Sequence, residues 1–272
     1  MATCVPVFLP DFRQRADLPG IDPGTMFGYM TTSLLARLKT YLFPGGDSAA
    51  CAMPGIRTTQ SGEIRAAATS AWRPFVAEET VDAMRSAFCW EATLGTGLTS
   101  VQVTDAYEHG HGRLLVRKGP LTLAHLTGPD VDQGELQRYL SYAVYCPSIV
   151  VNNPALDFAA VGLNTLRIRD RDGPPDAWVD VDLADDGRPI VMRAVRPMTV
   201  GRRVVPTEWS ATGAGAIEWR GLRICRRLEA SWHPPEGTFT YIRVNVSSVR
   251  TSASDDAEAS SSHSATADRG IA

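Results

Sequence analysis

One aromatic-rich helix is predicted in the middle of a chain whose other regular segments have the pattern of β-strands. In the segment 132–146 apolar residues recur at helical spacing. The segment also carries three tyrosines, which are Tyr139, Tyr142 and Tyr145. We expect Asp132 to cap the first turn, Glu135 to complete a capping box, and Pro147 to end the helix. A lone helix of this kind would close the mouth or flank of a sheet, where a binding cavity would lie.

The strand pattern is clearest between Thr238 and Val246, where side chains alternate between two faces. One face carries Phe239, Tyr241, Arg243 and Asn245, and the other carries Ile242, Val244 and Val246. Further strands are predicted over 56–66, 88–92, 98–107, 113–118, 121–127, 165–170, 178–183, 189–195 and 222–233. Gly119-Pro120 and Asp185-Asp186-Gly187 supply turns between neighbouring strands. This pattern indicates a mainly β (α+β) fold, in which a strongly curved antiparallel sheet or half-barrel is covered by a central capping helix.

Three parts are expected along the chain. Residues 1–50 form an N-terminal arm and a helix, whose apolar face is built from leucines between 32 and 43. Residues 51–250 form the curved antiparallel β-sheet domain, which includes the helix 132–146. Residues 251–272 contain almost no large apolar side chain, so we expect a disordered tail there.

The composition argues against several classes of protein. The formal net charge is −3 and the basic residues are spread along the strands, so nucleic acid is not an expected partner. The start has no signal-peptide pattern, and no apolar run approaches the roughly 20 residues that span a bilayer. We therefore expect no stable membrane insertion and a cytoplasmic location. The five cysteines lack zinc spacing and no nucleotide-binding motif is present, so neither a metal nor a cofactor is expected.

Several segments together resemble an uncharacterised bacterial family whose sheet is similar to that of lipoprotein carriers of the LolA/LolB type. The landmarks are 57–65, 72–75, 88–90, 105–107, 110–112, 134–140, Trp209 and 230–232. The resemblance covers roughly residues 35–250 and implies a half-barrel that can hold an apolar ligand. The family typically has an acid and a tryptophan where this chain has Tyr142 and Tyr145, and an acidic-basic pair where it has Val195-Arg196. Many members begin with membrane segments, whereas none is expected in this chain. Together with the replaced residues, this leads us to expect a soluble member adapted to a new ligand.

Four residues are candidates for proton transfer, namely Asp105, Tyr107, Tyr142 and His125. Asp105 and Tyr107 share one side of a strand, and a carboxylate beside a phenol in a closed cavity can hold a raised pKa and move protons. The alternative is structural, with Asp105 capping a turn or pairing with Arg138. His125 would share an apolar strand face with Leu121 and Leu123, either as a general base or as a core histidine with one hydrogen bond.

Aromatic and cationic side chains are candidates for holding a ligand. They are Trp90, Arg138, Tyr139, Tyr145, Trp209 and Trp232. Aromatic rings give a large contact area at low entropic cost, and Arg138 can clamp a carboxylate or a carbonyl. The alternative is that the rings only fill the core of a large sheet and that Arg138 extends outward.

These features lead to two hypotheses for function. The first is a cofactor-independent enzyme, of cyclase or isomerase type, that confines a small hydrophobic metabolite in a β-sheet cavity, plausibly in specialised metabolism. The second is a non-catalytic carrier of a lipid or another apolar ligand. A structural module with a filled core is a further alternative. The sequence specifies neither the substrate nor the oligomeric state.

Overall fold

The structure is a computed structural model that describes residues 23–201 and 203–252. Its described strands form one antiparallel sheet of 13 strands, in the order β6-β5-β4-β3-β2-β1-β13-β12-β11-β10-β9-β8-β7. Their bounds are β1 Gly55–Ile64, β2 Arg73–Asp82, β3 Ala87–Leu94, β4 Val101–Glu108, β5 His111–Lys118, β6 Leu121–Leu126, β7 Leu156–Ala160, β8 Thr165–Asp170, β9 Trp178–Leu183, β10 Pro189–Val200, β11 Arg203–Trp219, β12 Leu222–His233 and β13 Phe239–Thr251. The prediction of a mainly β fold with a strongly curved antiparallel sheet is confirmed.

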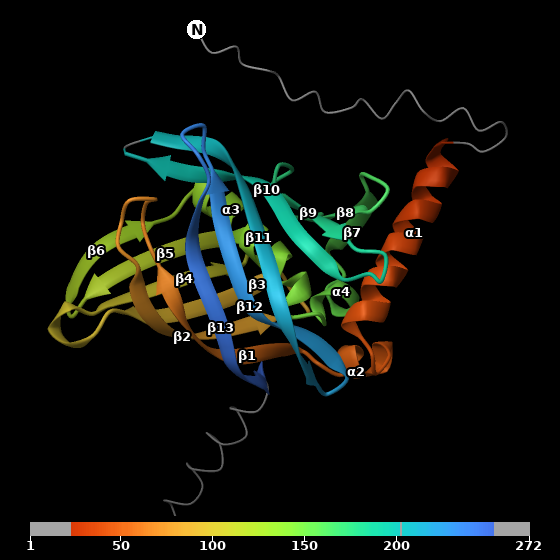
Figure 1. The fold of residues 1–272 in the computed structure, drawn as a ribbon, viewed down its shortest axis with the longest axis horizontal. Coiled ribbons are helices and arrows are strands. Elements are labelled where there is room, and N and C mark those ends of the chain that lie inside the picture. Colours follow the sequence, from red (N-terminus) through yellow and green to blue (C-terminus); the bar gives the residue numbers. More distant parts are fainter. Residues whose placement is uncertain (1–22, 202, 253–272) are drawn as a thin grey trace, which may run out of the picture.

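The sheet consists of two meanders that meet at the first and last strands. β1 to β6 form one meander and β7 to β13 the other, and β1 pairs with β13 along nearly its whole length. The two edge strands, β6 and β7, are therefore consecutive in the sequence but lie at opposite ends of the sheet. Figure 1 shows the sheet curving around the connection between these two strands.

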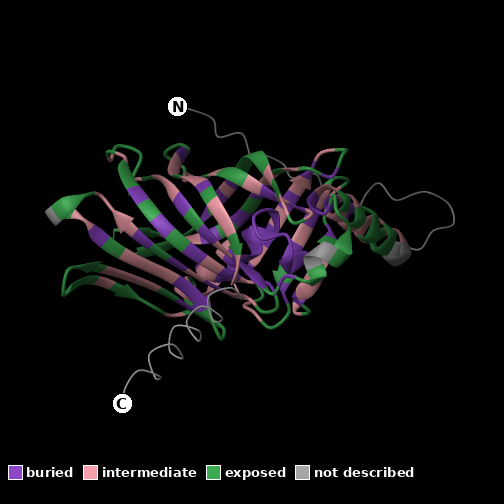
Figure 2. Cartoon of the chain, turned by 90° about the horizontal axis from the view of Figure 1, so that it is seen from below, coloured by how far each residue is buried: buried purple, intermediate pink, exposed green. Residues whose placement is uncertain are grey.

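That connection is helical and runs inside the curve of the sheet. It consists of α3 (Pro129–Ser141), the 3₁₀ turn η3 (Tyr142–Val144) and the short helix α4 (Ile149–Asn152). α3 contacts β4 and β5 on one side and β8, β9 and β10 on the other, so it bridges the two meanders. Figure 2 shows this largely buried helical segment enclosed by the strands.

Two polar side chains of α3 fix its position between the meanders. Asp132 accepts a hydrogen bond from the backbone N–H of Gly112 on β5 at 2.7 Å. Gly112 allows this approach, because a Cβ atom there would lie 2.5 Å from the carbonyl oxygen of Val131. On the other side, the Gln137 amide donates to the carbonyl oxygen of Val195 on β10 at 2.9 Å. The helix is thereby attached to both halves of the sheet.

The start of α3 differs from the prediction. The cap residue is Gly128 with a φ of 110° and without a side-chain cap, and Pro129 begins the helix. The predicted capping box is wrong, because Asp132 bonds to β5 instead and the side chain of Glu135 lines a cavity. The α-helix also ends at Ser141, so that Tyr142 belongs to the 3₁₀ turn and Tyr145 follows it.

The sequence patterns did not predict β2, β7 or β11. β2 carries adjacent acidic residues, one of which points to the inner face and breaks the apolar alternation. β11 contains Pro206 and two glycines, which are depleted in strands, and β7 is a short edge strand. All three are formed because neighbouring strands pair with them.

The N-terminal helix lies at one end of the sheet (Figure 1). α1 runs over Pro23–Leu42, longer than the predicted 32–43, and packs against β7, β8 and β12. Leu34, Leu38 and Leu42 are buried as predicted. The short helix α2 (Asp47–Cys51) follows α1 and precedes β1. Residues 1–22 and 253–272 lie outside the described residues, and they include most of the expected N-terminal arm and of the expected tail.

Within the described ranges, no helix combines the length and apolar character that a bilayer crossing requires. No group of three or more His, Cys, Asp or Glu side chains among residues 23–201 and 203–252 is arranged to hold a metal ion.

Candidate functional site

A row of inner-face side chains crosses the first meander. Strand register makes Thr58 the direct partner of Glu79, Glu79 the partner of Trp90, and Trp90 the partner of Asp105. Directly paired residues point to the same face of a sheet, so these four side chains lie side by side under α3. Glu79 is only 3% exposed, and a buried carboxylate requires partners.

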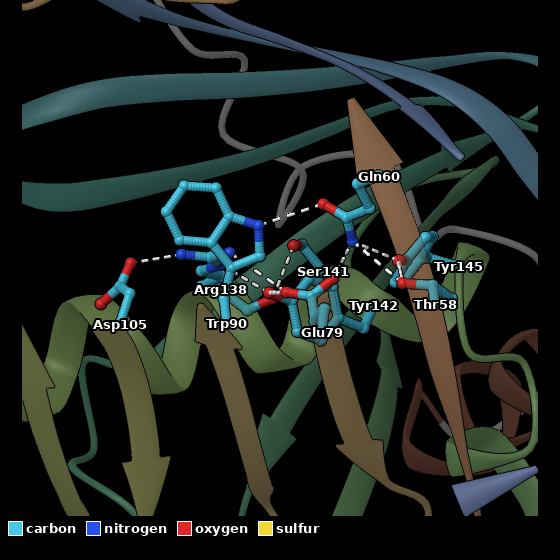
Figure 3. A network of polar contacts seen from close by, with 9 residues as sticks. All are labelled: Thr58, Gln60, Glu79, Trp90, Asp105, Arg138, Ser141, Tyr142 and Tyr145. Carbon is cyan, nitrogen blue, oxygen red and sulfur yellow. Dashed lines mark hydrogen bonds and ion pairs between the residues drawn. The ribbon is translucent and has the colours of Figure 1, made fainter. Parts of the chain in front are cut away.

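Arg138 of α3 supplies the positive charge for this row. Its Nη2 donates to Glu79 Oε1 at 3.1 Å, its Nη1 pairs with Asp105 Oδ2, and its Nε donates to the Tyr142 hydroxyl at 2.5 Å. The guanidinium also lies 4.9 Å from the ring centre of Phe88 and 5.1 Å from that of Trp90, within range of cation–π attraction. Figure 3 shows Arg138 between its two carboxylates. The structural alternative for Asp105, an ion pair with Arg138, is thus confirmed.

Neutral hydrogen-bonding groups complete the shell of Glu79. The Tyr142 hydroxyl donates to Oε1 and the Gln60 amide donates to Oε2 at 2.6 Å. Gln60 also contacts the Tyr145 hydroxyl and accepts a hydrogen bond from the Trp90 indole at 3.1 Å. Burial raises the pKa values of Tyr142 and Tyr145 well above the ordinary value for a phenol, so both remain neutral donors.

Asp105 and Glu135 form a second acidic feature beside Arg138. Burial, followed by the charge of Asp105, raises the pKa of Glu135 to about 8. Asp105 Oδ1 and Glu135 Oε2 are buried and have no donor within the described part of the chain. A proton on Glu135 satisfies both oxygens, so the pair carries one negative charge at neutral pH.

Arg196 enters from the second meander. It is 8% exposed, its Nη2 donates to the carbonyl oxygen of Gly134 on α3 at 2.6 Å, and its Nε is buried without a partner among the described residues. The guanidinium lies 4.9 Å from the ring centre of Trp209 and 5.8 Å from that of Trp232.

These groups border a cavity of about 610 Å³ between α3 and the inner face of the sheet. Most of its wall is apolar, and the residues that form this part include Ile64, Val103, Leu114, Met192, Met198, Leu228, Ala230, Ile242 and Val244. Leu126 and Val204 also line the cavity and are 43% and 44% exposed, so the cavity opens to solvent near them. An apolar space with a few convergent polar groups is typical of small-molecule sites.

Most of the predicted site residues meet at this cavity. Those that line it are Asp105, Tyr142, Trp90, Arg138, Tyr145, Trp209 and Trp232. They come from both meanders and from the α3–η3 connection, which explains why they are dispersed in the sequence.

Three predicted site residues lie elsewhere. Tyr139 is fully buried in the core, where its hydroxyl donates to the carbonyl oxygen of Asp82 and accepts from Asn153. Tyr107 is also buried away from the cavity lining, and burial raises its pKa to about 12. The alternative that His125 is a core histidine is wrong, because β6 is an edge strand where Leu121, Leu123 and His125 are exposed. These three positions are therefore poor candidates for contact with a ligand in the cavity.

The sequence patterns did not identify Gln60, Glu79 or Arg196 as site residues, and they placed Glu135 in a helix cap. Glu79 occupies an inner-face position in the alternation Phe75, Ala77, Glu79, Val81. Arg196 does the same in the alternation Met192, Ala194, Arg196, Met198. A charged residue at an otherwise apolar inner position was the signal that could have identified both.

No curated protein matches this chain. Among solved structures it is similar to a LolA superfamily protein from Nitrosomonas europaea, with 10% identity, a TM-score of 0.47, and coverage of 81% of this chain and 92% of that one. It is also similar to a DUF1329 family protein from Desulfovibrio piger, with 9% identity, a TM-score of 0.45, and coverage of 82% and 94%. A family model described as a family of unknown function, DUF6544, matches residues 38–244. The predicted resemblance to an uncharacterised family is confirmed, and the chain belongs to the DUF6544 family.

Proposed function

We propose that this protein binds a small hydrophobic molecule with a polar end in the cavity between α3 and the sheet. The observation that carries this proposal is the cavity itself, about 610 Å³ of largely apolar space with charged and hydroxyl groups gathered along α3. Apolar walls favour the transfer of an apolar ligand from water, whereas the polar cluster would fix its orientation.

Exposed apolar side chains near the opening support entry of such a ligand. Leu121 and Leu123 lie on β6 beside Leu126, and Val205 follows Val204 on β11. Their exposed fractions are between 42% and 61%. Exposed apolar groups beside a pocket commonly mark a surface where ligands or partners are exchanged.

The test is to fill the cavity and measure binding of a neutral apolar probe, N-phenyl-naphthylamine. Ala230 is buried, lines the cavity and pairs with Ala211, another small lining residue. We expect Ala230→Trp to place an indole in the space and to weaken probe binding at least about tenfold. Val76→Trp is the matched control, because Val76 is 61% exposed on a first-meander strand and does not line the cavity.

Equal probe binding by wild type and a folded Ala230→Trp variant would contradict the proposal. Native mass spectrometry of protein purified from its own host provides an independent measurement, since a retained small molecule should be present in wild type and absent from Ala230→Trp.

A second candidate function is a cofactor-independent cyclase or isomerase that acts on the same class of molecule. The observation that favours it is the Asp105–Glu135 pair, which holds a proton at the cavity wall beside Arg138. A proton-holding carboxyl pair can donate to one atom of a bound molecule and accept from another. Tyr142 could donate to a carbonyl of the ligand only by giving up its hydrogen bond to Glu79, because a phenol has a single hydroxyl proton.

The molecules that copurify with Asp105→Asn distinguish an enzyme from a carrier. An enzyme deprived of its proton-transfer group should retain the unconverted isomer, which has the same mass as the wild-type ligand but a different fragmentation pattern. A carrier should retain the same molecule in both proteins. An identical ligand in both would exclude a catalytic role for Asp105.

A further inference from the structure

Arg196 differs from Arg138 because it has no carboxylate in direct contact among the described residues. Arg138 uses all three of its guanidinium nitrogens, and its charge is met by two acids, Glu79 and Asp105. Arg196 donates only to a neutral backbone carbonyl, and no carboxylate of the described residues lies within ion-pairing distance of it. A buried guanidinium without a counter-ion is costly, because it has lost its hydration without gaining an opposite charge.

Glu135 is the nearest candidate for that counter-ion, but it is engaged with Asp105. Burial, followed by the charge of Asp105, raises the pKa of Glu135 to about 8, so Glu135 is mostly neutral at neutral pH. Two other acids line the cavity, Asp130 and Glu229, and both are exposed. Glu229 pairs with Arg243 at 3.3 Å. The buried guanidinium of Arg196 is thus left without a direct ion pair among the described residues.

The surroundings of Arg196 restrict what can supply the missing charge. Its guanidinium lies against the rings of Trp209 and Trp232, and these three residues and Met198 all line the cavity. The Nε–H has no acceptor among the described residues, and a carboxylate can accept two parallel hydrogen bonds from one guanidinium. The adjoining wall is apolar.

We propose that Arg196 is the binding site for the monoanionic head group, a carboxylate, of an amphiphilic molecule whose apolar part occupies the cavity. This assignment rests on the proposed function and specifies the class of ligand. A buried guanidinium that lacks a direct ion pair and a hydrogen-bond acceptor favours a carboxylate over a neutral alcohol and over a cationic head group. Arg138, the clamp expected from the sequence, is saturated by protein groups and serves to organise the wall.

The test compares three probes that share one alkyl chain, namely dodecanoate, dodecanol and dodecyltrimethylammonium. Binding is followed through the fluorescence of Trp90, Trp209 and Trp232, which all line the cavity, and by calorimetry. Wild type should bind dodecanoate at least about tenfold more tightly than dodecanol, and the cationic probe most weakly. Arg196→Gln should weaken dodecanoate binding by about 10- to 100-fold and leave dodecanol binding within about twofold.

Arg193→Gln is the matched control, since Arg193 lies on the same strand and is exposed, where it pairs with Asp182. Arg196→Lys keeps the charge and should retain a preference for dodecanoate over dodecanol, and circular dichroism checks that each variant is folded. If wild type binds dodecanol as tightly as dodecanoate, or if both Arg196 variants keep the wild-type preference, the assignment to Arg196 is wrong and the proposed apolar binding stands. If wild type binds none of the probes and also fails to bind N-phenyl-naphthylamine, the proposed function itself fails.

Discussion

Asp105 on β4 and Glu135 on α3 interact electrostatically at the cavity wall, although both are acids. The arrangement is stable only while one of them keeps its proton. Arg138 binds Asp105 directly, and Arg138 and Arg196 both lie near Glu135, so four charged or titratable groups from three elements meet here. Protonation of Glu135 therefore connects the stability of the fold with the charge of the cavity.

The free energy of unfolding should fall as pH rises between about 4.5 and 8. The pKa of Glu135 is raised from 4.5 to about 8 in the folded protein, so in this window the unfolded chain loses a proton that the folded protein keeps. Stability then decreases by at most about 1.4 kcal/mol per pH unit and levels off above pH 8. Urea unfolding at several pH values should show that Glu135→Gln gains stability relative to wild type as pH rises. Glu91→Gln, at an exposed position, should show the same pH dependence of stability as wild type. If Glu135→Gln also showed the wild-type pH dependence, the raised pKa of Glu135 would be refuted.

Removing the Glu79 carboxylate should destabilise the protein strongly. Glu79→Ala leaves the Tyr142 hydroxyl and the Gln60 amide without their acceptor and deprives Arg138 of one of its two acids. Loss of one member of a buried ion pair costs about 3–5 kcal/mol. Glu78→Ala changes the adjacent, exposed residue and should alter the free energy of unfolding by less than about 0.5 kcal/mol. Similar denaturation midpoints for the two variants would show that the network contributes little to stability.

The hydroxyl of Tyr142 should be energetically coupled to Glu79. Tyr142→Phe removes a hydrogen bond to that carboxylate and should cost about 1–3 kcal/mol in the wild-type background. In a Glu79→Gln background the same change should cost less, with a coupling energy of about 0.5–3 kcal/mol. Tyr139→Phe is the control cycle, because the Tyr139 hydroxyl contacts Asp82 and Asn153 rather than Glu79. Additive effects in both cycles would mean that the Tyr142 contact has no specific energetic role.

Binding of dodecanoate should weaken as pH rises through about 8. Ionised Glu135 would supply the counter-ion that Arg196 lacks and would repel the ligand carboxylate, which is already ionised at neutral pH. Calorimetric titrations from pH 6.5 to 9.5 should therefore show a falling affinity for wild type and a flat profile for Glu135→Gln. Dodecanol, which has no charge, should bind wild type equally across this range, and the same decline for dodecanol would point to a general change in the protein.

Much of the fold follows from local patterns. The alternation in β13, the turns at Gly119-Pro120 and Asp185-Asp186-Gly187, and the leucine stripe of α1 each depend on residues close together in the sequence. The helical segment α3 was also recognisable from its periodicity, although it ends at Ser141 and not at Pro147 as predicted. β2 and β11 were not recognisable, since Glu79 interrupts the apolar face of β2 and Pro206 and two glycines interrupt β11. Pairing with neighbouring strands decides their conformation.

The sequence by itself determined which side chains point to the inner face of the sheet and that a helix with aromatic residues must cover part of it. Only the tertiary structure decided which of those side chains meet. Arg138 binds acids from two strands that precede it by 59 and 33 residues, and Arg196 reaches the same cavity from the other meander without meeting an acid. The physical reason is that strand register and the crossing of α3 set these distances. The periodicity of a strand defines only which of its side chains share a face, and it does not specify which residues of other strands lie beside them.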